Sequence, residues 1–274
     1  MQKLKGHLLI NSVLLTAILG LSACGPKTLG PYAGTTETLE GLQAMGRAGP
    51  PSSSEQKSNI RVMAIKETAY SIGAQSGLAY RAKYINAYLI SHSRQLDKIY
   101  DFENLILENN VLPPILSEGK NAFNMASPNA LRIANTTYKI DRQAQFVTTA
   151  PNWRQYIWLD YKIPDRPHFS VLPKDSEERL AWDKYTYEGW QKGMEQADEI
   201  FSNNLARLKH DFVGMIRYRK LLAMNMVSPP YVSHTDLGVT GDNNQLRIDD
   251  RVLRIVALPG LKPNSKEWRA SVTK

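Results

Sequence analysis

Apolar residues recur every seven positions between Leu180 and Leu222, and this stripe constrains the fold more than any other feature of the chain. The stripe comprises Leu180, Tyr187, Met194, Phe201, Leu208, Met215 and Leu222, and it is widened by Trp190, Ala197, Leu205 and Phe212. This spacing predicts one long amphipathic helix, and Asp175 with Glu178 three residues later is typical of a capped helix start. A coiled-coil partner would also suit a heptad repeat. Because Gly189, Gly193 and Gly214 weaken a free-standing helix, we expect the stripe to pack within the protein, against its own sheet.

A second helical region is predicted from Ile60 to about Leu107, with Asn59 or Ser58 as the N-cap. Its apolar positions at helical spacing are Ile65, Ala69, Ile72, Leu78, Ile85, Leu89, Leu96, Ile99 and Phe102. We expect one or two helices with a break near Gly73 to Gly77, and close packing against a neighbour at these two glycines. Pro113 and Pro114 end the helical region, since proline lacks the amide donor.

Alternating apolar and β-branched residues predict strands in two regions. The first lies between Asn129 and Tyr161 and contains three candidate strands: 136–140, 146–149 and 156–159. Pro151 to Arg154 interrupts them as a turn or a single helical turn. The second region, 231–258, is predicted to form a hairpin, with turns at 241–244 and at Asp249-Asp250. The order of helix, strands, helix and strands indicates a single α+β body over residues 59–274.

The first 24 residues have the pattern of a bacterial lipoprotein signal. Lys3 and Lys5 precede a short apolar run, and Leu21-Ser22-Ala23-Cys24 resembles a lipobox. We therefore expect residues 1–23 to be removed and Cys24 to carry a diacylglycerol and further acyl chains such as palmitate. Gly25 stands where lipoproteins kept in the inner membrane usually have Asp, which favours the periplasmic face of the outer membrane. Residues 24–58, rich in Gly, Pro, Ser and Thr, are predicted to be a lipidated flexible tether unless a partner orders them.

Composition excludes several classes of function. Cys24 is the only cysteine, so the mature chain has neither an internal disulfide nor thiol catalysis nor a cysteine-ligated metal. Loss of Lys3 and Lys5 lowers the formal charge from +8 to +6, and the remaining charges of both signs are interleaved. This mild basic bias suits anionic lipids or acidic protein surfaces. A dedicated nucleic-acid binder would need clustered Lys and Arg, so we expect no specific nucleic-acid binding.

No residue pattern marks a catalytic centre. The chain lacks a Gly-x-Ser-x-Gly elbow, and its five histidines form no His-x-x-x-His pair: His7, His92, His168, His210 and His234. Glu177-Glu178 and Asp249-Asp250 are adjacent pairs typical of a helix start and a turn. We therefore expect that the protein is not an enzyme, and that it has no catalytic residue, no metal site and no cofactor.

The tryptophans leave one alternative open. Trp153, Trp158, Trp182, Trp190 and Trp268 suit a core, but aromatic rings also stack on sugars and anchor protein interfaces. Trp153 and Trp268 are the favoured interface residues because each lies in turn-rich sequence. The alternative function is therefore a peptidoglycan-binding or wall-processing periplasmic lipoprotein. A third hypothesis, a DNA-binding element of a conjugation channel, has only the positive charge in its favour.

Several short sequence motifs that follow the signal peptide resemble those of a known family. They are Leu112-Pro113-Pro114-Ile115, Pro151-Asn152-Trp153-Arg154, Glu188-Gly189-Trp190-Gln191-Lys192-Gly193, Asn225-Met226-Val227-Ser228-Pro229-Pro230 and Gly238-Val239-Thr240-Gly241. In this order, and together with the lipobox at Cys24, the chain resembles the DotC family over roughly Ile60 to Trp268. That family comprises outer-membrane lipoproteins of type IVB secretion systems, and relatives encoded on conjugative plasmids serve DNA transfer.

The resemblance implies a structural subunit of an outer-membrane core complex, assembled as a ring of copies. The implied partners are a second small lipoprotein, DotD-like, and a secretin-like, DotH-like subunit whose placement in the outer membrane depends on both lipoproteins. Only Cys24 carries over as a functional residue, as the lipidation site. Whether the system exports protein or transfers DNA stays open at this point.

Overall fold

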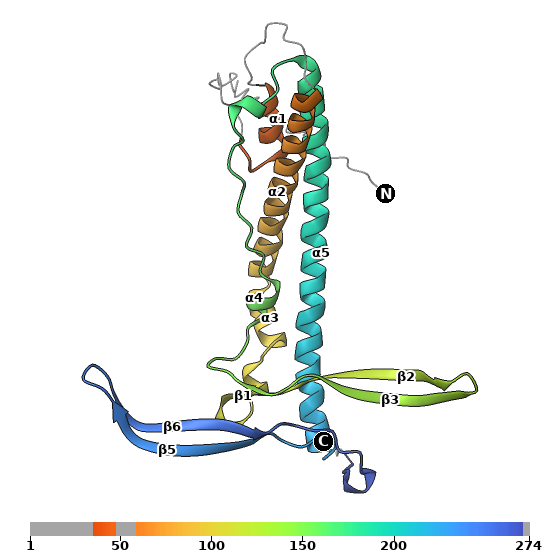
Figure 1. The fold of residues 1–274 in the computed structure, drawn as a ribbon, viewed down its shortest axis with the longest axis vertical. Coiled ribbons are helices and arrows are strands. Elements are labelled where there is room, and N and C mark those ends of the chain that lie inside the picture. Colours follow the sequence, from red (N-terminus) through yellow and green to blue (C-terminus); the bar gives the residue numbers. More distant parts are fainter. Residues whose placement is uncertain (1–34, 48–58, 271–274) are drawn as a thin grey trace, which may run out of the picture.

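Two long helices that run in the same direction form the axis of the molecule (Figure 1). The computed structural model describes residues 35–47 and 59–270. Helix α2 (Asn59–Ser91) packs along α5 (Ser176–Ala223), and we call this pair the shaft. The ion pairs Arg61–Glu178 and Arg81–Asp198 share the same offset in sequence, which requires parallel helices. At 1.5 Å per residue, the 48 residues of α5 extend for about 70 Å.

Parallel helices need a long connection, and here it carries several short elements back along the shaft. Helix α3 (Ser93–Ile99) continues α2, and α4 (Trp153–Ile157) lies in the returning segment. The connection also contains three 3₁₀ helices: η1 (Glu103–Leu105), η2 (Glu108–Asn110) and η3 (Phe169–Val171). Another 3₁₀ helix, η4 (Ser265–Glu267), lies after α5. Asn152 and Gln155 form a capping box on α4, and the Asp175 carboxylate accepts a hydrogen bond from the Glu178 amide at the start of α5.

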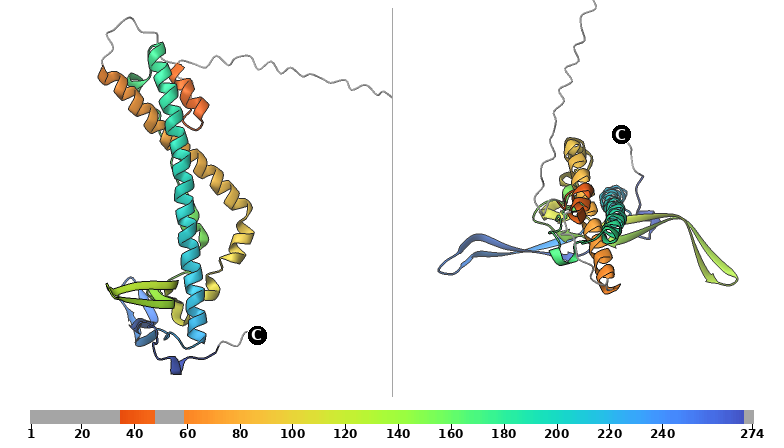
Figure 2. Two further views of the ribbon diagram at one scale, coloured as in Figure 1. Left: turned by 90° about the vertical axis from the view of Figure 1, so that its right-hand side faces the viewer. Right: turned by 90° about the horizontal axis from the view of Figure 1, so that it is seen from above.

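The strands form three separate two-stranded antiparallel sheets. Short strands β1 (Val111–Leu112) and β4 (Gln145–Phe146) pair beside the shaft. Two long hairpins are made by β2 (Ile115–Ser127) with β3 (Ala130–Arg142) and by β5 (Tyr231–Gly241) with β6 (Leu246–Ala257). They extend from the same end of the shaft to opposite sides (Figures 1 and 2). The predicted α+β class is confirmed.

Three buried clusters lie in sequence along the shaft. The first joins α1 (Leu39–Arg47), α2 and α5 around Trp182 and Trp190. The second joins the end of α2, the segment 102–115, α4 and the second half of α5, with Phe102 and Trp153 among its buried residues. The third lies between the two hairpins, around Tyr218. None of the helices in the described ranges has the length and hydropathy needed to cross a bilayer.

The prediction for α5 is confirmed in its start, its extent and its packing within the protein, and Leu208 and Met215 of the predicted stripe are buried. The face in the first half of the helix and the packing partner are corrected. Leu180 and Tyr187 of the predicted stripe are exposed, and Trp182, Thr186, Gly189 and Gly193 are buried instead. The partner of this face is α2 rather than a sheet. Gly189 and Gly193 lie at this contact because the backbone of α2 approaches α5 too closely there for a side chain.

The predicted break near Gly73 to Gly77 is wrong, because α2 continues to Ser91. The predicted close packing at these glycines is confirmed. A side chain on Gly73 would meet the backbone of Thr186, and one on Gly77 the backbone of Trp190.

The strand predictions are partly corrected. The candidate strand at 136–140 is the inner part of β3, whereas Tyr156 and Ile157 belong to α4 rather than to a strand. Strand β2 was not predicted, since its outer half alternates poorly. The hairpin over 231–258 is confirmed, but Asp249 lies inside β6 with φ 57° at an irregular point of the ladder and makes no turn.

Part of the predicted tether is folded. Residues 39–47 form α1, in which Leu42 and Met45 are buried and the Leu42 carbonyl accepts a hydrogen bond from the Trp182 indole at 2.8 Å. The tether prediction therefore does not hold for these residues. The predicted signal peptide, Cys24 and residues 48–58 lie outside the described residues.

Candidate interaction surface

The β2–β3 hairpin, which we call the β2–β3 arm, has an apolar patch near its tip. Phe123 is paired with Ile133 and Met125 with Leu131, so all four side chains lie on one face. Each is exposed by more than half. Four large apolar side chains on one exposed face are typical of a surface that another chain covers.

The β5–β6 hairpin, which we call the β5–β6 arm, has a similar outer half. Leu237, Val239, Leu246 and Ile248 are its exposed large apolar residues. Asp242 closes the turn by accepting hydrogen bonds from the amides of Asn244 and Gln245. Within the described chain, only the partner strand of the same arm pairs with β5 or β6 as a strand.

Both arms have free strand edges along their outer halves (Figure 2). Each strand of a two-stranded sheet has one edge whose amide and carbonyl groups face no further strand, and such an edge is a template for strand addition. An isolated hairpin is marginally stable in water, and a third strand or a packed face is normally required. The arms are therefore the part of the described chain that most requires a partner.

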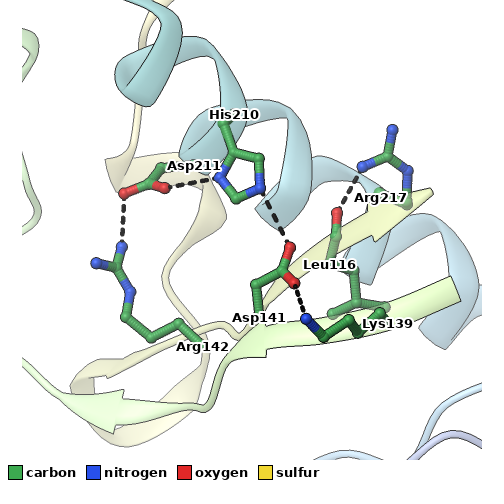
Figure 3. A network of polar contacts seen from close by, with 7 residues as sticks. All are labelled: Leu116, Lys139, Asp141, Arg142, His210, Asp211 and Arg217. Carbon is green, nitrogen blue, oxygen red and sulfur yellow. Dashed lines mark hydrogen bonds and ion pairs between the residues drawn. The ribbon is translucent and has the colours of Figure 1, made fainter. Parts of the chain in front are cut away.

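A network of charged side chains fixes the base of the β2–β3 arm to α5 (Figure 3). The Arg142 guanidinium donates to the buried Asp211 carboxylate at 2.7 Å, and the Tyr156 hydroxyl donates to the same oxygen at 3.1 Å. The ring of His210 lies between two carboxylates, with Nδ1 3.1 Å from Asp211 and Nε2 3.2 Å from Asp141. A neutral imidazole donates from one nitrogen only, so both contacts are hydrogen bonds donated by the ring only when it is protonated.

Electrostatics at this joint favour the ionised form of Asp141. Its pKa is lowered by a hydrogen bond from Ser117 and, to a smaller extent, by those from His210 and Lys139. Burial has the opposite effect on Tyr156, whose pKa is raised by loss of solvent and by the nearby Asp211 carboxylate. The ionised Asp141 carboxylate thus contacts Lys139 of β3 and His210 of α5, and it helps to hold the strand on the helix.

Arg217 makes a second attachment between α5 and β2. Its guanidinium donates to the Leu116 carbonyl at 2.5 Å (Figure 3) and to the Glu118 carboxylate at 3.2 Å. Gly214, one turn earlier, lets the helix approach the backbone of Leu116 directly, because a side chain there would meet Ile115 and Leu116. The arm therefore has a defined direction relative to the shaft at its base.

The β5–β6 arm is held at the C-terminal end of α5 by the segments on both of its sides. Val227 pairs with Leu261, and the Ser228 amide donates to the Gly260 carbonyl at 2.9 Å. The Tyr218 hydroxyl donates to the Ser228 carbonyl at 3.3 Å, and burial raises the pKa of Tyr218 to about 12. Neutral Tyr218 is thus available as a donor at any physiological pH.

The structure separates the two tryptophans predicted to favour an interface. Trp153 is buried, donates to Asp97 at 2.7 Å and lies beneath the Arg154 guanidinium. Trp268 is 42% exposed and donates to the Lys262 carbonyl. Trp153 is thus a core residue, whereas Trp268 is partly exposed near the base of the β5–β6 arm.

Sequence reasoning missed the apolar tips of the arms. The signal was present as Phe-x-Met and Leu-x-Ile on either side of Ser127-Pro128-Asn129, a turn-forming triplet. The predicted lipidation site, Cys24, lies outside the described residues. Across residues 35–47 and 59–270, no three His, Cys, Asp or Glu side chains gather in a way that would hold a metal ion.

Comparison with known proteins gives one family. A family model described as "Type IV secretory system, conjugal DNA-protein transfer", of the TraI type, matches residues 59–270. A search among curated proteins found no match. The matched region comprises the shaft, both arms and the segments that attach them. Because the model covers most of the chain, this protein belongs to the TraI family of type IV secretory systems, which acts in conjugal DNA-protein transfer.

Proposed function

We propose that this protein is a structural subunit of the outer-membrane core complex of a type IVB secretion or conjugation system, similar to DotC. In this proposal Cys24 carries the lipid that anchors it to the periplasmic face of the outer membrane. The protein assists the placement and assembly of a secretin-like, DotH-like subunit together with a DotD-like lipoprotein. It carries out no catalysis and needs no cofactor.

The observation that carries the proposal is the pair of arms. An elongated chain that holds two apolar-tipped hairpins with free edges at one end of a long shaft is built for assembly with other chains (Figure 1). Membership of a type IV secretory family gives the system in which that assembly takes place. The lipobox-like sequence Leu21-Ser22-Ala23-Cys24 supports the proposed lipid anchor and the proposed location on the periplasmic side of the membrane.

Substitution of Cys24 tests the anchoring part. We expect Cys24→Ala to lower the amount of the protein in the outer-membrane fraction and to lower the amount of assembled core complex. The matched control is Ser22→Ala, which keeps a small residue before an intact Cys24. Envelope fractionation with quantitative blotting measures the first effect, and affinity purification of the complex measures the second. Unchanged location and assembly in Cys24→Ala would contradict the proposal.

A further inference from the structure

The two arms carry opposite charge in their outer halves. Between residues 119 and 138 of the β2–β3 arm, the charged residues are Lys120 and Arg132, with no acidic residue. Between residues 236 and 251 of the β5–β6 arm there are four carboxylates and two guanidinium groups, a net charge of −2. The four carboxylates belong to Asp236, Asp242, Asp249 and Asp250. A basic arm and an acidic arm attract each other and repel their own kind.

The positions of the arms allow the oppositely charged arms of neighbouring copies to meet. They extend from the same end of the shaft to opposite sides, in the view of Figure 1 and in the view from above on the right of Figure 2. The β2–β3 arm of one copy can therefore overlap the β5–β6 arm of the copy beside it, while the two arms of a single copy point away from each other. Repetition of such a head-to-tail contact gives a ring if the rotation closes and a filament if it does not.

We propose that the β2–β3 arm of one copy pairs edge to edge with the β5–β6 arm of the next copy, forming an intermolecular four-stranded sheet. This proposal rests on the proposed function and specifies the surface through which copies assemble. Main-chain hydrogen bonds between the free edges provide affinity, and the opposite charges select the unlike arm. The apolar tips then belong to a four-stranded sheet. A sheet with a hydrophobic face needs three or more strands to be stable on its own.

Crosslinking between introduced cysteines tests the pairing in the full chain, in its native envelope. Asn135 of β3 and Thr235 of β5 are exposed and lie midway along their arms. With a short bismaleimide, Asn135→Cys/Thr235→Cys is expected to give a ladder of dimers, trimers and larger multiples of the chain. Each single variant contributes only one half of the contact and is expected to give no ladder. Ser202→Cys, exposed on α5, controls for collision between copies.

Charge reversal tests the selection of the unlike arm. Lys120→Glu/Arg132→Glu is expected to lower the yield of the ladder by about tenfold, since attraction becomes repulsion at a partly screened distance. Adding Asp236→Lys and Asp249→Asn is expected to restore it. Asn is chosen at residue 249 because it tolerates the positive φ there. Reversal of Lys98 and Lys209, exposed on α3 and α5, changes the charge equally and is expected to leave the ladder intact.

Three outcomes would overturn the pairing: no ladder in the double variant, dimers from a single variant alone, or adducts only to a different protein. Restoration by the second pair of substitutions shows that the first pair did not simply unfold the arm. Absence of the ladder from an Asn135→Cys/Thr235→Cys protein that still fractionates with the outer membrane and with its complex contradicts the pairing but leaves the proposed function standing. Loss of location and complex contradicts the proposed function itself.

Discussion

Four glycines set how closely the two long helices approach. Gly73 and Gly77 of α2 face the backbone of α5, and Gly189 and Gly193 of α5 face the backbone of α2. A side chain on any of them would collide with a carbonyl of the opposite helix. The shaft is therefore held by backbone contact over this stretch, with aromatic side chains such as Trp182 and Trp190 on its flanks.

Gly193→Ala tests this contact. Alanine is favoured over glycine in a helix interior by about 1 kcal/mol, so a helix without a close neighbour would gain stability. Because the backbone at Ala74 occupies the space, we expect a net loss of about 1–3 kcal/mol from overpacking. Urea unfolding of the purified chain measures it. In Gly119→Ala, the control, the nearest atoms to the new methyl group are 4.0 Å away. A higher urea midpoint for Gly193→Ala than for the parent chain would refute the close contact.

Asp97 makes the contact between α3 and α4 sensitive to acid. Its carboxylate accepts hydrogen bonds from Arg154 at 2.9 Å and from the Trp153 indole at 2.7 Å. The hydrogen bond from Arg154, and then that from Trp153, lower the pKa of Asp97 below its usual value. A lowered folded-state pKa contributes stability above the unfolded pKa, and this contribution is lost as the pH falls through the folded-state pKa.

Asp97→Asn is therefore expected to flatten the acid side of the stability curve. As the pH falls below about 4, the pKa of Asp in an unfolded chain, the parent chain loses the stability that ionised Asp97 contributes. The variant has no carboxylate at residue 97 and therefore loses nothing there. Urea midpoints measured from neutral pH downward give the slope for each protein. Asp160→Asn, at an exposed position, provides the comparison. Equal slopes for Asp97→Asn and the parent would rule out this role for Asp97.

The arms owe their direction to a few contacts at their bases. For the β2–β3 arm these are the pair Arg142–Asp211, the ring of His210 and the guanidinium of Arg217 (Figure 3). Beyond residue 118 the arm leaves the shaft and its residues are mostly exposed. A partner that binds the outer half of the arm thus acts on a segment that is attached to the shaft at its base, by these polar contacts and by the buried side chains of Ile115 and Leu116.

Arg142→Met tests the joint. The variant leaves the buried Asp211 carboxylate without its guanidinium partner, which we expect to cost about 1–3 kcal/mol. We also expect faster amide hydrogen exchange at the base of β2 and β3. Lys139→Met is the matched control, because Lys139 is 77% exposed and its ion pair with Asp141 is long, at 3.5 Å. Its effect is expected to stay within about 0.5 kcal/mol. Equal exchange rates in the two variants would contradict a role for Arg142 in holding the arm.

The elements differ in how far the sequence predicted them. The start of α5 was predictable because Asp175 and Glu178 carry a local capping signal, and the hairpin over 231–258 because its turn residues are also local. Which face of α5 is buried was not predictable from the heptad pattern. Leu180 and Tyr187 fit the heptad but are exposed, whereas Gly189 and Gly193 are buried because α2 approaches closely there. Strand β2 escaped prediction because, among the described residues, its outer half pairs with β3 but has no face buried against another element, so nothing imposes an alternating pattern.

At the scale of the whole molecule, the shaft separates two different ends. Helix α1 packs near Trp182, at one end of α5, and both arms leave the other end near Leu221 (Figure 1). The helix between these two residues is about 60 Å long. With Cys24 in the outer membrane, as proposed, the N-terminal side carries the anchor and the far end carries the surfaces through which copies and partners meet.

The most direct measurement is purification of the tagged, full-length protein from its native envelope in mild detergent, followed by mass spectrometry and particle imaging. We predict a large ring that contains many copies of this chain, a second small lipoprotein and a secretin-like subunit. In that ring the arms of neighbouring copies are expected to lie side by side. Recovery as a lone lipoprotein, or together with cell-wall fragments only, would contradict the role as a core-complex subunit.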